Sequence, residues 1–399
     1  MSRPDTAPRR ARDPRLDFFR GVLLWMIFVD HVPGNPYEEW ATLRNWGFSD
    51  AAESFFIISG IAAGIAYSGR FATWRETGLW PAVAPMWKRA WVLYLSHIFL
   101  TLAGIAVFAF AAEQLGLVEL LTKNNLRQVF QNTGEAIVGI VTLGHQIGYM
   151  NILPAYSILL LAAPAAILIG QRAPRLMVIA SVLLWFATGL WRWNLPAYPN
   201  PGGWFFNPFA WQLIFVIGLL SGMAARRGET FVPRSRALFW IAAGWLVIVL
   251  AWRYVPEFGP AMNRRMAWLS SLGFPFHITS HDKTYLPFLR MTHALALVYV
   301  MSSLPIVTRL TAMGWAEPIR VMGRQGLLIF SAGALLSYVG QTLLAWQPDN
   351  PLVPWLYIPA GTLALIALAW MADWKRRAGQ PTARTLVAKS RGAEAVSAE

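Results

Sequence analysis

The composition of the chain is that of an integral membrane protein. Of its 399 residues, 56% are hydrophobic and only 14% are charged, whereas soluble domains carry about 25% charged residues. The mean hydropathy is +0.42. These values exclude a water-soluble enzyme, and the continuous apolar stretches exclude a β-barrel, in which apolar residues alternate with polar ones. The sequence has no cysteine, which excludes disulfides, cysteine-ligated metal clusters and a thiol acyl-enzyme.

The net charge of +14 is concentrated at the two ends of the chain. Segments 1–20 and 375–399 together carry 12 Lys and Arg against 5 Asp and Glu, which is half of the net excess. Basic tails beside apolar spans are typical of cytoplasmic anchors near anionic lipid, and they do not indicate nucleic-acid binding. We therefore expect basic cytoplasmic tails at 1–16 and 375–399 and an all-α transmembrane domain over 17–374.

Ten apolar stretches predict about ten transmembrane helices, because roughly 20 apolar residues span a bilayer. Lys and Arg are more frequent in the loops on the side of the tails, which predicts that both termini are cytoplasmic. The stretches are 17–33, 51–68, 87–112, 150–170, 174–194, 208–226, 236–254, 290–310, 323–346 and 352–372.

The connections predicted on the opposite side are long and rich in aromatic residues, Pro and Gly. They cover 34–50, 113–149, 195–207 and 255–289. We expect them to form re-entrant or interfacial segments over a cavity. The alternative for any one Trp is membership of the aromatic belt at the level of the lipid headgroups.

The first predicted helix carries a cation and an imidazole on one face. Arg20 and His31 are eleven residues apart, close to three full turns, which separates them by about 16 Å along the axis. Asp17 lies near the same stripe, whereas Asp30 points about 80° away from it. Ionisable groups within spans are costly and indicate a functional site. The alternatives are an Arg20 that snorkels to headgroups and a His31 satisfied by a neighbouring helix.

The second predicted helix contains a carboxylate and two small residues. Glu53 lies one turn inside an apolar helix and requires a partner, and a His or Arg of the first helix is the nearest in sequence. The alternative is a rim carboxylate in headgroup water. Gly60 and Gly64 follow the small-xxx-small pattern that allows close helix contact.

Six ordered segments resemble a known family. Arg20 and His31 match the Arg-x10-His signature of the acyltransferase family 3 membrane proteins, and the longer segments resemble the OpgC-type succinyltransferases, which acylate periplasmic glucans. The resemblance runs over about residues 15 to 345. The segments are Arg15–Gly21, Asp30–Asn35, Phe48–Glu53, Asn151–Tyr156, Asn207–Gln212 and Asp282–Leu286.

The resemblance implies a bacterial inner-membrane enzyme that passes an acyl group from a cytoplasmic donor, succinyl-CoA, to a hydroxyl of an osmoregulated periplasmic glucan. It also implies that His31 is catalytic and Arg20 essential. Neutral imidazole suits a general base, because its reference pKa of about 6.5 is near working pH. Asp30 or Glu53 is expected to orient the ring. The expected partners are the glucan, the acyl-CoA donor and the lipid bilayer, without nucleic acid; the oligomeric state and the choice between succinyl and acetyl stay open.

Further residues are assigned to the two substrates. For the donor phosphates we expect, with Arg20, the basic residues at the cytoplasmic helix ends, although most of them are ordinary positive-inside residues. These are Arg70, Arg75, Lys88, Arg89, Arg320 and Arg324. On the acceptor side, Asn151, Trp211 and Gln212 are candidate oxyanion donors. Lys283 and Arg290 are expected to bind the succinyl carboxylate, with Asp282 as their local partner.

The other histidines do not predict a metal site. His97 and His293 lie inside predicted spans and are interpreted as core histidines. His277 and His281 are four residues apart, but the prolines at 275 and 287 argue against a regular helix, so we expect no metal.

Two other functional classes remain open. A transporter or flippase would export an acyl group or glycan without making a bond, but inverted repeats are not evident. A passive sensor or scaffold is the other class, but it would not explain why charged residues occur within the membrane-spanning stretches. Within the enzyme class, we expect direct transfer rather than an acyl-enzyme, because no Ser occupies a recognisable nucleophile setting.

Overall fold

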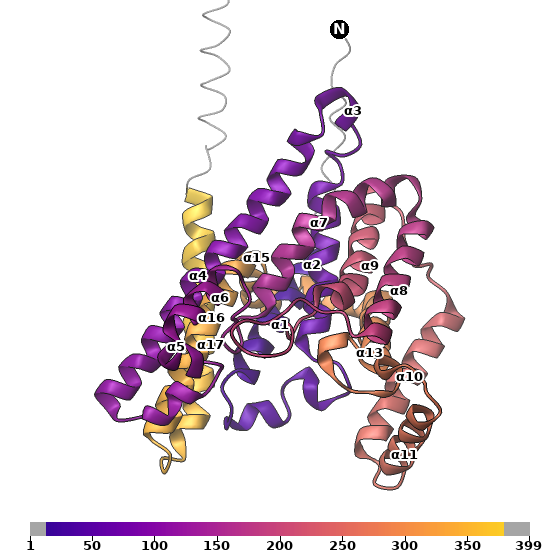
Figure 1. The fold of residues 1–399 in the computed structure, drawn as a ribbon. Coiled ribbons are helices and arrows are strands. Elements are labelled where there is room, and N and C mark those ends of the chain that lie inside the picture. Colours follow the sequence, from indigo (N-terminus) through magenta and orange to yellow (C-terminus); the bar gives the residue numbers. More distant parts are fainter. Residues whose placement is uncertain (1–12, 379–399) are drawn as a thin grey trace, which may run out of the picture.

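The computed structural model describes residues 13–378, and these residues are almost entirely helical (Figure 1). Within that range the only β-type pairing is an isolated bridge between Pro196 and Gly203. The all-α prediction is confirmed. Most of the two predicted basic tails falls outside the described residues.

Each of the ten predicted stretches contains a helix, and short helices occupy several of the connections. The helices of these stretches are α1 (Pro14–Asp30), α2 (Ala51–Tyr67), α4 (Trp80–Leu115), α7 (Ile152–Arg172), α8 (Pro174–Trp191), α9 (Pro208–Arg227), α10 (Arg236–Tyr254), α13 (Phe288–Ser303), α14 (Pro305–Ala312), α16 (Gly326–Trp346) and α17 (Leu352–Ala378). The helices of the connections are α3 (Trp74–Thr77), α5 (Arg127–Gln131), α6 (Thr133–Val141), α11 (Phe258–Ser271), α12 (Phe276–Thr279) and α15 (Glu317–Arg324).

Fewer than ten of the described helices are candidate membrane spans when judged by their length and composition. Among the described residues, seven helices are long and apolar enough to cross a membrane, or eight if the bent pair α13 and α14 is counted as one span. Helices α1 and α2 have 17 residues each, a length of about 25 Å. They are shorter than a full bilayer core, so the count of ten stays a prediction.

The span predicted over 290–310 is not one continuous helix. The chain bends by 75° between α13 and α14, at Leu304, whose backbone is extended. Pro305 follows directly, and a proline both lacks an N–H and disfavours a helical residue before it. The break is therefore a local effect of the Leu304–Pro305 step.

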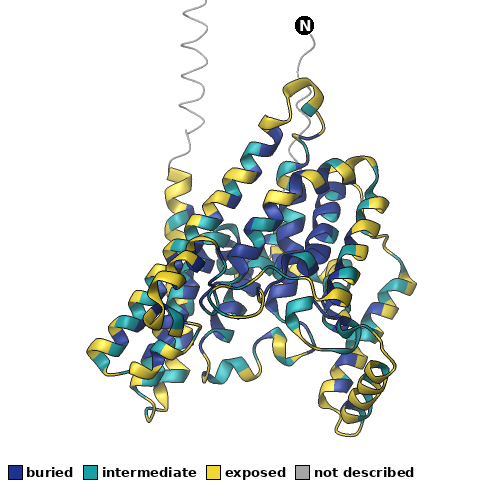
Figure 2. Ribbon diagram, in the orientation of Figure 1, coloured by how far each residue is buried: buried dark blue, intermediate teal, exposed yellow. Residues whose placement is uncertain are grey.

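Glycines let α2 and α9 pack backbone against backbone. A Cβ atom at Gly60 or Gly64 would collide with backbone atoms of α9, and one at Gly218 or Gly222 would collide with backbone atoms of α2. The small-xxx-small prediction for Gly60 and Gly64 is confirmed. This close pair forms the centre of the bundle, as the dark blue ribbons of Figure 2 show.

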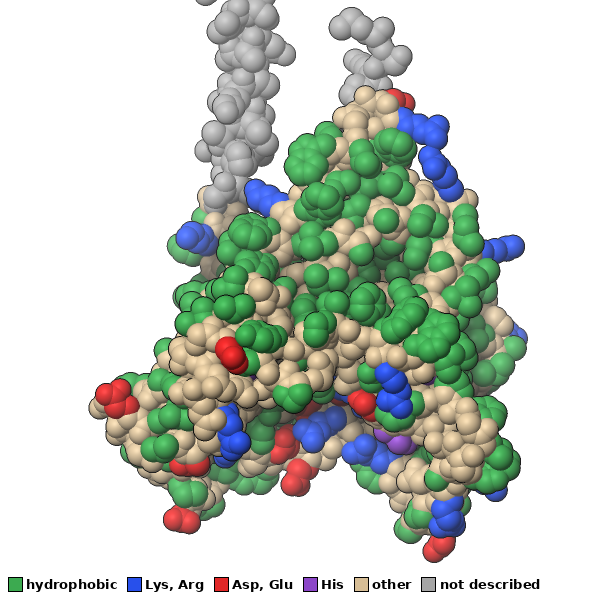
Figure 3. All heavy atoms as spheres, viewed as in Figure 1, with side chains coloured by type: hydrophobic (Ala, Val, Ile, Leu, Met, Phe, Trp, Pro, Cys, Tyr) green, Lys and Arg blue, Asp and Glu red, His purple; other side chains and the backbone are tan. Residues whose placement is uncertain are grey.

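The two ends of the molecule differ in shape. The turn at α3 and the end of α17 lie at the top of Figure 1, and α5 and α11 lie at its lower end. Hydrophobic side chains cover much of the middle of the face in Figure 3, whereas acidic, basic and His side chains gather in a hollow at its lower end. The candidate site is built at this hollowed end and on the helices above it.

Candidate active site

Four charged side chains from three separate segments meet at the start of α2. Lys283 Nζ is 2.5 Å and Arg290 Nη2 2.9 Å from the same carboxylate oxygen, Asp50 Oδ2. Arg290 also binds Glu53 Oε1 at 2.7 Å. The Glu53 side chain is fully buried, so its charge requires such a partner. The cluster joins the loop before α2 to the segment that enters α13.

The sequence places Asp50 and Glu53 by a capping box. Asp50 is the N-cap of α2, where its side chain accepts a hydrogen bond from the backbone N–H of Ala52, and Glu53 accepts one from the backbone N–H of Asp50. Burial acts to raise the pKa of Asp50, but the charges of Lys283 and Arg290 outweigh it and hold that pKa below its usual range. Asp50 is therefore ionised at neutral pH.

His31 lies beside this cluster, at the C-cap of α1. Its ring packs against the ring of Tyr149, with centroids 4.2 Å apart. The ring therefore contacts protein rather than lipid, and it lies within electrostatic range of Lys283 and Asp50. Its Nδ1 is buried with no hydrogen-bond partner among the described residues. Its backbone carbonyl accepts a hydrogen bond from Gln341 at 2.8 Å.

Three expected pairings are wrong. Glu53 binds Arg290 rather than a residue of the first helix. The carboxylate partner of Lys283 and Arg290 is Asp50; Asp282 instead accepts a hydrogen bond from the backbone N–H of Thr284. In each case a partner far along the chain replaces the one nearest in sequence.

Asp30, the other predicted orienting carboxylate, lies near the cation of a loop. Its Oδ1 is 3.9 Å from Nη1 of Arg44, which also lies 3.5 Å from Glu38. The structure thus ties Asp30 to the segment that follows His31.

A cavity of about 200 Å³ lies between the helices nearer the other end of α1. Three of the seven predicted donor-binding cations line it: Arg20 of α1, Arg89 of α4 and Arg324 of α15. The remaining lining is Phe55, Ser59, Ala62, Ala63, Ala66, Tyr67, Leu93, Leu153, Tyr156, Gly326, Leu327 and Phe330. Arginines from three helices therefore converge on one cavity, and His31 is not part of its lining.

The other four predicted donor-binding cations do not line this cavity. Arg70, Arg75 and Lys88 are exposed. Arg320 binds Glu317 at 2.6 Å and the backbone carbonyl of Met313 at 2.9 Å, so it holds the turn before α15.

The side chains of the three candidate oxyanion donors have different settings. Trp211 Nε1 donates to the backbone carbonyl of Lys283 at 3.2 Å, which ties α9 to the charge cluster. The Gln212 side chain forms two hydrogen bonds with Ser181 of α8, at 2.5 and 2.8 Å. Asn151 is the N-cap of α7, where its side chain makes no capping hydrogen bond.

The histidines within and between spans occupy different settings. His293 is buried, and its Nδ1 lies 2.7 Å from Ser49 Oγ. His97 is buried in α4. His277 packs its ring on Trp185, with centroids 4.5 Å apart, whereas His281 is exposed. The described residues contain no group of three potential metal ligands.

Sequence reasoning missed several residues of the site. Asp50 carries a recognisable signal, since Asp-x-x-Glu before an apolar run is the pattern of a capping box. Tyr149 and Ser49 carry no comparable signal, because each contacts its histidine only through the tertiary fold. Tyr156 and Ser59, which line the cavity with Arg20, are likewise brought there by packing.

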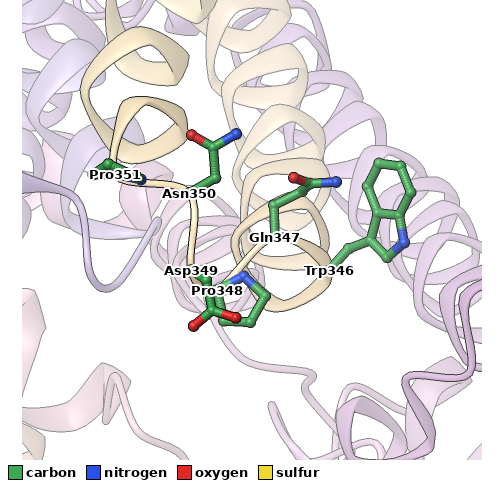
Figure 4. Close-up of a pocket in the computed structure, with 6 residues that line it drawn as sticks. All are labelled: Trp346, Gln347, Pro348, Asp349, Asn350 and Pro351. Atoms are coloured by element: carbon green, nitrogen blue, oxygen red, sulfur yellow. The ribbon is translucent and has the colours of Figure 1, made fainter.

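A second hollow, of about 450 Å³, lies at the turn between α16 and α17 (Figure 4). It contains none of the candidate site residues. Its lining is Trp346, Gln347, Pro348, Asp349, Asn350 and Pro351.

Comparisons with known proteins agree with the resemblance found in the sequence. The family model described as OpgC protein matches residues 12–377, nearly the whole chain. No curated protein matches the chain. No solved structure matches it either.

Proposed function

The chain belongs to the OpgC family, and we propose that it is an inner-membrane O-acyltransferase that moves a succinyl group from cytoplasmic succinyl-CoA to a hydroxyl of a periplasmic glucan. Membership of the family supports a role in the modification of periplasmic glucan and implies a transferase. The observation that carries the finer proposal is the relation of two sites along α1. Arg20 faces an arginine-lined cavity, and His31 lies at the opposite end beside the cluster of Asp50 and Lys283.

The cavity supports a donor site for an anionic molecule. Arg20, Arg89 and Arg324 present guanidinium groups, which bind phosphate oxygens in a bidentate manner. Arg324 is also held by Glu317 at 2.7 Å, which fixes its direction. We assign the phosphates of the donor to this cavity, from which the slender acyl arm would extend between the helices toward His31.

We assign the chemistry to the outer end of α1. A ring nitrogen of His31 takes the proton of the glucan hydroxyl while the hydroxyl oxygen attacks the thioester carbonyl. The tetrahedral intermediate then collapses to the ester, and the thiolate of the donor leaves with the proton from the imidazolium. A positioned base of this kind contributes about 10² to 10⁴ in rate.

Lys283 is the residue we assign to the free carboxylate of the succinyl group. Its ammonium has three donors, of which one is used by Asp50. It also lies 5.4 Å from the Phe206 ring centroid and 5.7 Å from that of Phe205. Arg290 is more fully engaged, by both Asp50 and Glu53.

Purified protein in detergent with labelled succinyl-CoA and unsubstituted glucan tests the proposal. We expect an ester on the glucan. In Lys283→Gln, we expect the preference for succinyl-CoA over acetyl-CoA, measured as kcat/KM for each donor, to fall by about tenfold, the scale of a charge-assisted hydrogen bond. An equal loss for both donors would contradict the role of Lys283. Transport of donor or glycan into vesicles without ester formation would overturn the enzyme assignment.

Direct transfer has its own test. Ser49 is hydrogen-bonded to His293. It is the candidate nucleophile for a covalent mechanism, because a histidine beside a hydroxyl is the usual arrangement for an acyl-enzyme. Direct transfer predicts that incubation with donor alone leaves the protein unmodified in intact-mass spectra. A succinylated Ser49 would replace direct transfer by a covalent relay.

A further inference from the structure

The loop that joins α1 to α2 exposes a tryptophan from a firmly held backbone. Trp46 is 53% exposed. The residues beside it are anchored from α10: the Tyr254 hydroxyl donates to the carbonyl of Asn45 at 2.5 Å, and Arg253 donates to the carbonyl of Gly47 at 3.2 Å. The large apolar side chain is therefore presented to solvent by a segment with little freedom to fold it away.

The polar atom of Trp46 is already satisfied. Its indole N–H donates to the carbonyl of Trp40, in the same loop, at 2.9 Å. A tryptophan that anchors a protein at the membrane interface combines an apolar body with a polar end that faces water and headgroups. With its N–H bound inside the loop, Trp46 offers an exposed aromatic surface and no donor, which suits stacking better than anchoring.

The position of this surface connects it with the proposed reaction. The loop begins at His31 and ends at Asp50, so both of its ends belong to the candidate site. In Figure 1 the loop crosses the lower end of the molecule as the indigo segment, and Figure 3 shows that this end is hollowed. A molecule resting on the loop therefore lies at the same end of the bundle as His31.

We propose that the exposed face of Trp46 is a stacking subsite for a glucose ring of the acceptor glucan. This inference rests on the proposed function. A glucose ring has apolar C–H faces and hydroxyls around its edge, so an aromatic surface can hold it without using up the hydroxyls. The chemistry fits a neutral glucan, and it leaves an edge hydroxyl free to be turned toward His31.

Direct binding tests the proposal without requiring turnover. Isothermal titration of purified protein in detergent with unsubstituted, neutral periplasmic glucan should give a Kd that rises about three- to tenfold in Trp46→Ala, the scale of one aromatic stacking contact. Trp46→Phe should keep most of the affinity, because it retains an aromatic face. Trp268→Ala is the matched control, since Trp268 of α11 is 61% exposed, and it should bind like the wild type.

The outcomes separate the inference from the proposed function. Weaker binding in Trp46→Ala alone supports the subsite, and it does so even if the wild-type protein forms no ester, a result that would overturn only the proposed transfer. Unchanged binding in a folded Trp46→Ala, judged by size-exclusion elution, overturns the subsite. Equal loss of membrane insertion in Trp46→Ala and Trp268→Ala, with unchanged affinity, would assign Trp46 to the interfacial belt and overturn it as well.

Discussion

The His31 side chain can be removed without removing a structural hydrogen bond. Its Nδ1 has no partner among the described residues, and the bond from Gln341 goes to the backbone carbonyl, which every variant retains. We therefore predict that His31→Ala lowers kcat for glucan succinylation by about 10² to 10⁴, with a melting temperature close to that of the wild type. Transfer assays and thermal unfolding in detergent measure the two quantities. Undiminished transfer would remove His31 from the mechanism.

At the scale of residues, the sequence identified buried charged groups but not their partners. Glu53 was identified because a carboxylate inside an apolar helix is costly. Its partner, Arg290, is 237 positions away, and no local pattern links residues at such a separation. The same holds for Lys283, whose assigned neighbour was Asp282 and whose observed partner is Asp50. The free-energy cost of a charge within an apolar stretch lets the sequence identify that charge. Only the tertiary fold identifies the residue that neutralises it.

At the scale of elements, the contact between α2 and α9 should tolerate no added atom. A Cβ at Gly60 would collide with the backbone carbonyl of Phe215, so Gly60→Ala should destabilise the protein by about 1 to 3 kcal/mol, the usual cost of overpacking. Gly244 on α10 is the matched control, because a Cβ there meets nothing within 4 Å. Gly244→Ala should be neutral or stabilising, since alanine is the better helix former.

Thermal unfolding in detergent distinguishes the two alanine variants. The melting temperature should fall for Gly60→Ala and hold or rise for Gly244→Ala. Equal melting temperatures would show that α2 and α9 are not in backbone contact. The glycine spacing alone indicated close packing but did not identify the partner helix.

Helix positions were predicted well because an apolar stretch of this length has few structures other than a helix open to it in a membrane. Their ends and continuity were predicted less well. Helix α4 extends from Trp80 to Leu115, beyond the predicted 87–112, since the helix continues past the most apolar part. The bend at Leu304 had a signal in Pro305, but hydropathy averages over a window and does not register one residue.

At the scale of the whole molecule, hydropathy did not reveal which helices are central. In α9, 78% of the apolar window is buried inside the protein, whereas in α10 only 17% is, although both have a mean window hydropathy of 1.7. Lipid and protein interior are equally apolar, so a helix surrounded by protein and one facing lipid have the same composition. The location of the arginine-lined cavity between α1, α2, α4, α7, α15 and α16 therefore could not be derived from hydropathy.

The orientation of the whole molecule is testable because the sequence contains no cysteine. A single introduced cysteine is then the sole target for a maleimide. The excess of Lys and Arg on the side of α3 predicts that this side is cytoplasmic, and α11 lies at the other end (Figure 1). Thr77 of α3 and Ser271 of α11 are both exposed, which makes Thr77→Cys and Ser271→Cys a matched pair.

In cells with a permeabilised outer membrane and an intact inner membrane, a membrane-impermeant maleimide should label Ser271→Cys and leave Thr77→Cys unlabelled. Both variants should react once the inner membrane is disrupted. The proposed reaction needs this orientation, since it places the arginine-lined cavity toward the cytoplasmic donor and His31 toward the periplasmic glucan. Labelling of Thr77→Cys alone in cells with an intact inner membrane would show that the protein has the opposite orientation in the membrane. The proposed direction of transfer would then be wrong.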